Sequence, residues 1–386
     1  MLDGKPPGSF ASTKVQALLI YLAVTGRPQS RETLIGLLWA AKPEADAKTN
    51  LRQALSNLRK LVPNHVLIQR DTAAFNRDSL HVIDVHCFDD HLKADRLAAA
   101  IEVYHGDFLD GFAVRDAPEF EEWALTQREH WRELALRALH TLTERALQQG
   151  DYAGGVDAAR RTLALDPWRE EAHAQLMLLL ARSGQFSAAL AQYAVCRRLL
   201  ADELGVEPLP ETTALHARIK AARAGPRHNL PSQATPFVGR HDELALVMKR
   251  LRDPTCRLLT LIGPGGSGKT RLVLQAAAQC RGAFLNGVFF LPLAALDAAD
   301  QIAPAIAHTL RFEFHGQADL KTQLIGYLRD KELLLVLDNF EHLSAAAPLI
   351  MELLEHAPAL KLLITSRERL NLRSEWLIEV PGLQVP

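Results

Sequence analysis

One stretch decides the fold of this chain: Gly263-Pro264-Gly265-Gly266-Ser267-Gly268-Lys269-Thr270. It fits the phosphate-loop pattern G-x-x-x-x-G-K-[ST] at every fixed position. The apolar run 257–262 before it predicts a short buried strand, and the run 271–278 after it predicts a helix. Strand, loop and helix in this order predict an α/β P-loop NTPase domain built on a parallel sheet.

The residue types of the stretch suit a phosphate group. Its glycines let backbone N–H groups turn inward with no Cβ in the way, and the following helix directs the positive end of its dipole at the anion. Lys269 is expected to reach the outer phosphates, and the Thr270 hydroxyl to ligate Mg²⁺. The alternative is a glycine-rich turn with a chance lysine, which would not explain why strand, loop and helix all agree. The cradle is expected to comprise Gly263, Gly265, Gly266, Ser267, Gly268, Lys269, Thr270 and Arg271.

A second apolar run, 333–337, ends in Asp338. Such a run favours a buried parallel strand, and an acid at its end is typical of a magnesium site. On its own the run would indicate only a core strand. Downstream of a phosphate loop it predicts that Asp338 shares Mg²⁺ with Thr270, and that Lys269 and Asp338 are catalytic.

Length and composition bound the remaining possibilities. A chain of 386 residues is expected to hold two or three domains, and 48% hydrophobic with 23% charged residues is typical of globular proteins. The formal net charge of −1 gives no global attraction to polyanions. The four cysteines form no C-x-x-C pair, which argues against a zinc site or a disulfide framework. Neither a signal peptide nor a membrane-length apolar run is present in the sequence, so we expect a cytoplasmic protein with no membrane partner.

The N-terminal third predicts three helices, over 14–24, 31–39 and 47–61. In the third helix four leucines share one face, and no acidic residue occurs between 47 and 70. A solvated surface helix would normally include Glu and Asp, whereas a helix that contacts phosphates and base edges in a major groove would not. The residues expected to contact DNA from this helix are Lys48, Thr49, Asn50, Arg52, Gln53, Ser56, Asn57, Arg59 and Lys60.

Two short strands, 66–70 and 79–83, are expected to follow and to bracket a polar turn. Three helices and a hairpin in this order predict a winged helix-turn-helix, whose wing would bring Arg70 and Arg77 to the DNA backbone. Residues 1–82 hold eleven Lys and Arg against six Asp and Glu. The basic excess therefore lies where double-stranded DNA is expected to bind.

The middle of the chain, 88–223, has a helical pattern almost throughout. Gly150-Asp151-Tyr152 returns as Gly184-Gln185-Phe186, an offset of 34 residues, which is the tetratricopeptide period. Stacked helix pairs of this kind offer grooves for partner proteins or for self-association. The segment holds no catalytic constellation, and its helix histidines His173 and His216 have no partner at ligand spacing.

Two parts of this region resemble a known family. The run 50–61 (NLRQALSNLRKL), together with 71–76 (DTAAFN), resembles SARP/AfsR-type bacterial transcriptional activators, whose DNA reader is OmpR-like. Residues 104–112 and 120–123 look like the bacterial transcriptional activator domain that follows this reader. The resemblance implies that the chain binds promoter DNA, and that its helical module contacts RNA polymerase or self-associates.

A linker with three prolines, 224–236, precedes the stretch 237–244 (FVGRHDEL), which resembles the motif ahead of the phosphate loop in STAND NTPases, a class that includes the NB-ARC group. The segments 338–343 and 362–367 look like the Walker B and sensor segments of the same class. The resemblance implies ATP or ADP as cofactor, and Arg367 is expected to respond to the γ-phosphate charge. The residues implied near the adenine are Phe237, Val238, Gly239 and Arg240.

Asn339 follows the magnesium aspartate where vigorous ATPases often carry a catalytic acid. An amide cannot accept a proton from the attacking water at neutral pH, and Glu341 is only a weak substitute. We therefore expect slow hydrolysis, typical of a switch.

The expected organisation is a winged helix-turn-helix over 1–87, an all-α, TPR-like bacterial transcriptional activator domain over 88–223, the linker 224–236, and a STAND/NB-ARC-like P-loop NTPase domain over 237–386 that lacks its C-terminal part. The expected function is that of a DNA-binding transcriptional activator gated by ATP or ADP. One alternative is a signalling or defence ATPase whose winged helix docks protein rather than DNA. Another is a metabolic P-loop enzyme, although no substrate pocket with its own acid or base is visible in the sequence.

Overall fold

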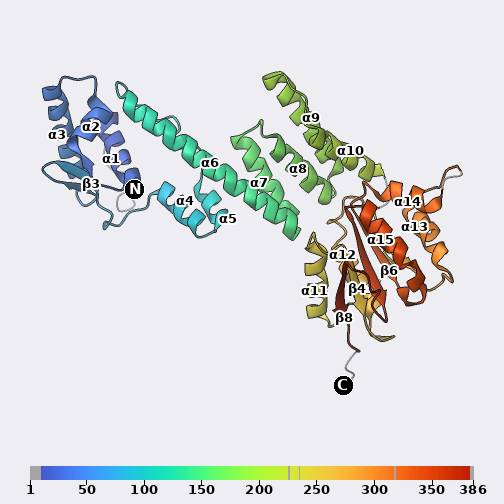
Figure 1. Cartoon of the computed structure of the whole chain (residues 1–386). Helices are drawn as coiled ribbons and strands as arrows, with labels where there is room; N and C mark the ends of the chain where they lie inside the picture. Colours follow the sequence, from blue (N-terminus) through green and yellow to red (C-terminus); the bar gives the residue numbers. More distant parts are fainter. Residues whose placement is uncertain (1–9, 225–226, 234, 317–318, 383–386) are drawn as a thin grey trace. The chain divides into compact units, whose positions relative to one another are not determined.

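The computed structural model describes residues 10–224, 227–233, 235–316 and 319–382 (Figure 1). The chain divides into two compact units, 1–142 and 143–386, and each is described by itself. The boundary falls inside one long helix, α6 (Pro118–Gln149), which therefore contributes to both units.

The first unit begins with three helices and a small sheet. The elements are α1 (Thr13–Thr25), β1 (Gln29–Ser30), α2 (Arg31–Trp39), α3 (Glu44–Leu61), β2 (Val66–Ile68) and β3 (Thr72–Phe75). The strands pair antiparallel in the order β1-β3-β2. Ser30 caps α2 by accepting a hydrogen bond from the Thr33 N–H. Helix α3 begins before the predicted residue 47, and Glu44 and Asp46 in its first turn complement the helix dipole.

One predicted strand was wrong. Residues 79–83 form no strand, and β2 pairs instead with β3, so that Val66 lies opposite Phe75. The chain after β3 turns at Asn76, whose carbonyl accepts a hydrogen bond from the Ser79 hydroxyl at 2.6 Å. Strand β3 is hard to find in the sequence because two of its four residues are alanine, which has little strand preference, although Ala73 and Phe75 form its buried face.

A continuous core joins the helices of this unit. Leu18 of α1, Leu38 of α2 and Leu58 of α3 are fully buried in one cluster. Val114 and Phe120 pack into the same cluster, although the sequence assigns them to the next segment. Two short helices, α4 (Asp84–Lys93) and α5 (Leu97–Val103), lie between β3 and α6 in the sequence.

The second unit opens with a series of helices that pack in sequence order, each on the next. They are α7 (Tyr152–Leu165), α8 (Glu170–Arg182), α9 (Phe186–Leu199), the π-helical turn η1 (Leu200–Leu204) and α10 (Pro210–Ala224). Gly150 and Gly184 adopt φ angles of +78° and +88° in the turns that precede α7 and α9. A larger residue would be strained there, which explains why glycine recurs at both positions.

The rest of the second unit is an α/β domain with a parallel sheet of order β5-β6-β7-β4-β8. The strands are β4 (Leu258–Ile262), β5 (Val288–Pro292), β6 (Leu333–Asp338), β7 (Leu360–Ser366) and β8 (Glu375–Glu379). The helices are α11 (His241–Arg252), α12 (Lys269–Gln279), η2 (Ala299–Gln301), α13 (Ile302–Leu310), α14 (Leu320–Leu328), η3 (Phe340–Ala346) and α15 (Ala347–His356). One apolar cluster joins the sheet to α11 and α12, and a second joins it to α13, α14 and α15. The predicted strands before the phosphate loop and before Asp338 are confirmed.

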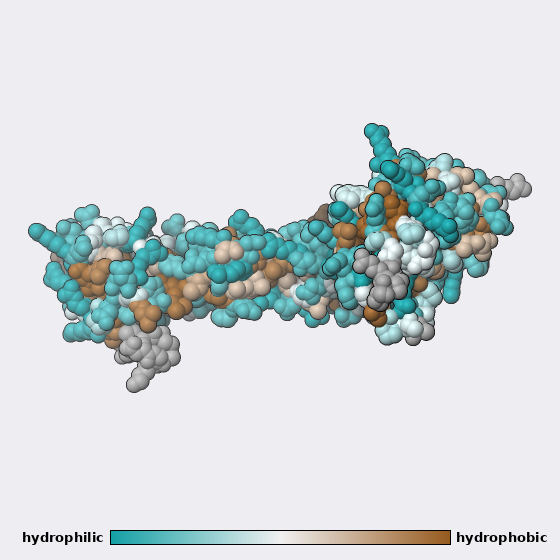
Figure 2. Space-filling model, turned by 90° about the horizontal axis from the view of Figure 1, so that it is seen from below, coloured by the Kyte–Doolittle hydropathy of each residue, from teal (hydrophilic) through white to brown (hydrophobic). Residues whose placement is uncertain are grey.

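The outer surface is mixed in polarity. In the view of Figure 2, hydrophobic residues form small groups among hydrophilic ones. Across the described part of the chain, the helices are too short or too polar to cross a lipid bilayer.

Candidate functional site

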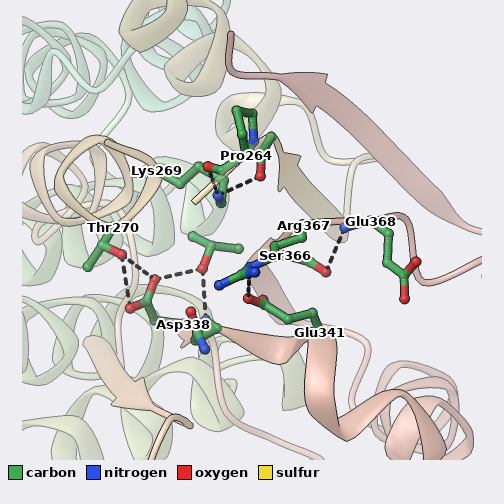
Figure 3. A network of polar contacts seen from close by, with 11 residues as sticks. Pro264, Lys269, Thr270, Asp338, Glu341, Ser366, Arg367 and Glu368 are labelled. Carbon is green, nitrogen blue, oxygen red and sulfur yellow. Dashed lines mark hydrogen bonds and ion pairs between the residues drawn. The ribbon is translucent and has the colours of Figure 1, made fainter. Parts of the chain in front are cut away.

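The phosphate loop lies between β4 and α12. Gly266 and Gly268 have φ angles of +76° and +86°, which other residues adopt only with strain. Gly263 is required for a different reason, because a Cβ at this position would lie 2.3 Å from the Val380 carbonyl oxygen. Lys269 folds back over the loop, and its Nζ donates hydrogen bonds to the carbonyls of Gly263 (2.7 Å) and Pro264 (2.9 Å) (Figure 3). Burial lowers the pKa of Lys269 below its ordinary value.

Three side chains meet where the sheet strands end beside the loop. Thr270 Oγ1 donates to Asp338, at 2.8 Å from Oδ1 and 3.0 Å from Oδ2 (Figure 3). Thr365, at the end of β7, donates its hydroxyl to Asp338 Oδ1 at 2.6 Å, and it accepts the Asn339 N–H at 2.9 Å. The sequence-based prediction that Thr270 and Asp338 lie together is confirmed. The contact of Thr365 with Asp338 was not predicted, because the pairing of β6 with β7 cannot be read from the sequence.

The chemistry of these groups fits a magnesium nucleotide. A hydroxyl and a carboxylate side by side are oxygen ligands of the kind that Mg²⁺ prefers. Ser267 Oγ is buried and finds no hydrogen-bond partner in the described part of the protein. A buried hydroxyl of this kind in a phosphate loop is free to donate to a phosphate oxygen.

Arg367 and Glu341 form an ion pair at the edge of the loop. Arg367 Nε lies 3.0 Å from Glu341 Oε1, with the arginine 67% exposed and the glutamate 17% exposed (Figure 3). A Cβ at Gly265 would lie 3.6 Å from Arg367 Nη2, so the guanidinium is next to the loop. Glu341 Oε2 is buried without a partner among the described residues. Asn339 has a φ angle of +70° and directly precedes η3.

In the segment that precedes α11, Arg240 lies close to the phosphate loop. Arg240 adopts φ +54°, donates to the Pro381 carbonyl at 2.7 Å and pairs with Glu243 at 3.2 Å. Its Nε lies 3.9 Å from the position that a Cβ on Gly268 would occupy. Phe237 packs against the core of the domain, whereas Val238 is 85% exposed.

Arg271 supports this segment rather than facing the loop. Its Nη2 donates hydrogen bonds to the backbone carbonyls of Thr235 and Pro236, at 2.7 and 2.5 Å. The side chain therefore fastens the segment before Phe237 to helix α12. Any contact of Arg271 with nucleotide would come from its backbone.

The candidate DNA residues of α3 divide between two flanks. Arg52, Ser56 and Arg59 line a hollow of about 300 Å³ that they share with Arg31 and Gln69. Arg31 Nη2 donates to the Gln69 carbonyl at 3.0 Å, and its Nε is buried with no partner in the described chain. The sequence did not predict a role for Arg31, because the packing of α2 on α3 and the pairing of β1 with β3 bring it beside Arg52 and Arg59. Its position directly after the Ser30 cap was the signal that could have found it.

The other flank of α3 has a different chemistry. Asn50, Gln53 and Asn57 line a second hollow together with Trp39 and Val114. The remaining candidates are exposed or paired: Thr49, Lys60 and Arg70 are exposed, Lys48 forms an exposed ion pair with Glu44, and the Arg77 guanidinium lies against Gly26 at the end of α1.

The described residues contain no group of three or more His, Cys, Asp and Glu arranged to hold a metal ion. His173 is buried and bonds through Nε2 to the Pro167 carbonyl (2.8 Å) and through Nδ1 to the Gln192 amide (2.6 Å). All four cysteines are free thiols. Burial raises the pKa of Cys196 and Cys280 to about 11, so both stay protonated at neutral pH.

Comparison with known proteins finds two families along the chain. Residues 71–220 match the bacterial transcriptional activator domain, and residues 252–373 match an AAA domain. The regulatory protein AfsR of Streptomyces coelicolor is 30% identical over 386 residues, covering 88% of this chain and 38% of AfsR. AfsR of Streptomyces griseus is 29% identical over 401 residues, covering 94% of this chain and 40% of the relative. The chain thus spans about two fifths of the length of these relatives.

Among solved structures, Mycobacterium tuberculosis EmbR in complex with a low-affinity phosphopeptide is similar over 56% of this chain and 61% of EmbR, at 25% identity and a TM-score of 0.41.

Proposed function

We propose that this chain, a transcriptional regulator of the SARP type that carries an AAA domain, binds promoter DNA under the control of ATP or ADP. The proposal that the chain binds nucleotide rests on the contact of Thr270 with Asp338 beside the phosphate loop. The proposal that the chain binds DNA rests on three arginines, Arg31, Arg52 and Arg59, which line one hollow of the N-terminal helices.

In the nucleotide site, each residue has a distinct role. The loop amides and Lys269 bind the phosphates. Arg240 contacts the nucleotide from the segment ahead of α11, because its Nε lies next to Gly268 of the loop. Thr270 and Asp338 would hold Mg²⁺, which when bound offsets the phosphate charge. Thr365 orients Asp338 through the 2.6 Å hydrogen bond.

We propose that hydrolysis at this site is slow, because neither Asn339 nor Glu341 is suited to act as the general base. Asn339 carries an amide, which cannot take a proton at neutral pH. Glu341 has one carboxylate oxygen engaged by Arg367 at 3.0 Å. A γ-phosphate beside Gly265 would compete with Glu341 for the Arg367 guanidinium, so the ion pair gives the protein a means to distinguish ATP from ADP.

In the DNA half, the reader is a winged helix in which α3 enters the major groove. The arginines at its flank present positive charge with no acid among the residues of the hollow. Such charge suits the phosphates beside the groove. Asn50, Gln53 and Asn57 are amides on the same helix, and amides can read adenine edges. The helical domain contacts RNA polymerase or a second copy of the chain.

One experiment tests both halves. Binding of fluorescent ATP and ADP is measured for the wild type and for Lys269→Ala, and binding of duplex DNA is then measured with no nucleotide, with ATP and with ADP. We expect Lys269→Ala to lose nucleotide binding, and the wild type to differ in DNA affinity between ATP and ADP. Nucleotide binding without any duplex binding would favour the alternative of a STAND-type ATPase whose winged helix docks protein. Duplex affinity that is the same in all three conditions would overturn the gating.

A further inference from the structure

The α/β domain contributes a side chain to the core of the helices that precede it. Leu285, in the segment between α12 and β5, is 1% exposed and belongs to the cluster formed by Leu176 and Leu179 of α8 and Ile219 of α10. The contact is close. A Cβ on Gly282 would lie 3.0 Å from the Arg182 carbonyl, and a Cβ on Gly287 would lie 2.2 Å from the Arg227 carbonyl.

Glu332 forms the polar part of the same contact. Its Oε1 accepts from Arg182 Nη2 at 2.6 Å, and its Oε2 accepts from Arg218 Nη2 at 3.0 Å. Arg182 ends α8 and Arg218 lies on α10, so a single carboxylate joins two helices to the α/β domain. Glu332 is only 15% exposed, which protects both ion pairs from full solvent screening.

Further contacts tie the segment that carries Leu285 to Glu332, and tie Arg227 to the edge strand β5 and to α9. The Asn286 N–H donates to the Glu332 carbonyl (2.8 Å), and the Glu332 N–H donates to Asn286 Oδ1 (2.9 Å). The Arg227 carbonyl accepts the Val288 N–H at 2.9 Å, while the Arg227 guanidinium lies 4.8 Å from the Phe186 ring centroid on α9. Residues 227–229 thus follow the edge of the sheet along β5.

This contact lies at the ends of α12 and β6 that are opposite the phosphate loop and Asp338. Helix α12 begins with Lys269 and Thr270 and leads directly into the segment that carries Leu285. Strand β6 begins after Glu332 and ends at Asp338. The two elements that hold the phosphate and magnesium chemistry therefore each reach the helices at their opposite ends.

We propose that α8, α9 and α10 dock on this end of the α/β domain, and that docking and nucleotide binding stabilise each other through α12 and β6. The inference rests on the nucleotide binding proposed above. Docking fixes the far ends of both elements, which preorganises the loop and Asp338 for a ligand. By thermodynamic reciprocity, a nucleotide that favours the docked form must bind less tightly when docking is weakened.

The test compares nucleotide affinity in variants of the full chain. Glu332→Gln keeps the size of the side chain but removes its charge, and Arg218→Gln removes one of its two partners at a partly exposed position. Glu352→Gln is the matched control, because it breaks the 2.9 Å ion pair with Lys321 within the α/β domain and does not touch the helices. We expect Glu332→Gln to weaken ATP binding by about fivefold, the low end of measured couplings, with a smaller loss in Arg218→Gln and none in Glu352→Gln.

Hydrogen exchange of α8 gives the reciprocal measurement. Adding nucleotide to the wild type is expected to slow exchange around Leu176 and Leu179, and Glu332→Gln is expected to remove this effect. Equal ATP affinity in Glu332→Gln and the control, with α8 exchange indifferent to nucleotide, would overturn the coupling while leaving the proposed function intact. A wild type that binds no nucleotide would overturn both, and a flat binding isotherm identifies that case.

Discussion

Thr365 donates its hydroxyl hydrogen to Asp338 Oδ1 at 2.6 Å, the same carboxylate oxygen that Thr270 approaches from the phosphate loop. Asp338, at the end of β6, is thus held by a hydroxyl from strand β7 and a hydroxyl from helix α12. Thr365 also accepts the Asn339 N–H, so one buried hydroxyl fixes both residues at the end of β6. The position of the carboxylate depends on a side chain that would not itself touch the metal.

Replacing this hydroxyl should reduce the magnesium-dependent part of nucleotide binding. We expect Thr365→Val to lower it by about tenfold, as loss of a group that orients a metal ligand commonly does. Thr365→Ser restores the hydroxyl and should recover most of the affinity. The measurement is ATP binding with Mg²⁺ and with EDTA. An equal loss in both conditions would show that Thr365 acts on the fold and not on the metal ligand.

Arg31 should act with Arg52 and Arg59 on duplex DNA. Each arginine that contacts a phosphate adds about one to the slope of log affinity against log salt. We therefore expect Arg31→Gln, like Arg52→Gln and Arg59→Gln, to weaken binding to all duplex sequences and to reduce the slope by about one. Arg373→Gln, an exposed arginine of the α/β domain, is the control. An unchanged slope for Arg31→Gln would remove Arg31 from the interface.

The Arg367–Glu341 ion pair predicts opposite effects for its two members. Glu341→Gln weakens the hold on the guanidinium, so ATP should bind more tightly relative to ADP. Arg367→Gln removes the group that would contact the γ-phosphate, so the preference for ATP should fall. Comparing the ATP-to-ADP affinity ratio in the two variants isolates this effect from general changes in the pocket. Shifts of that ratio in the same direction would contradict competition for the guanidinium.

The sequence predicted the phosphate loop and the elements on either side of it, because each depends on residues that are close together in the chain. The loop, the helix after it and the strand that ends at Asp338 each follow from a local pattern, and the parallel sheet brings them together. Thr365, Arg31 and Leu285 could not be assigned in this way, because their roles arise from strand pairing and from packing between distant segments. The strand expected at 79–83 was wrong for a related reason: β2 pairs with the alanine-containing β3 at the centre of the sheet, and the two-residue β1 forms the other edge. A sheet that small leaves little periodicity to detect.

His173 should make the helical module less stable at acid pH. Burial lowers the pKa of His173 below its ordinary value of 6.5, and the neutral ring is held between the Pro167 carbonyl and the Gln192 amide. The unfolded chain binds a proton at His173 near pH 6.5, whereas the folded chain binds it only at lower pH. The stabilising contribution of the neutral His173 ring is therefore fully present above pH 6.5, and it decreases as the pH drops below that value.

Urea unfolding followed by helical circular dichroism at pH 7.5 and pH 5.5 measures this loss. His173→Gln offers an amide that does not titrate, so its stability should differ less between the two pH values than that of the wild type. His356→Gln, at an exposed position, should keep the wild-type difference. If His173→Gln shows the full wild-type loss at pH 5.5, the acid sensitivity has another source, and the buried ring at His173 is not the titrating group.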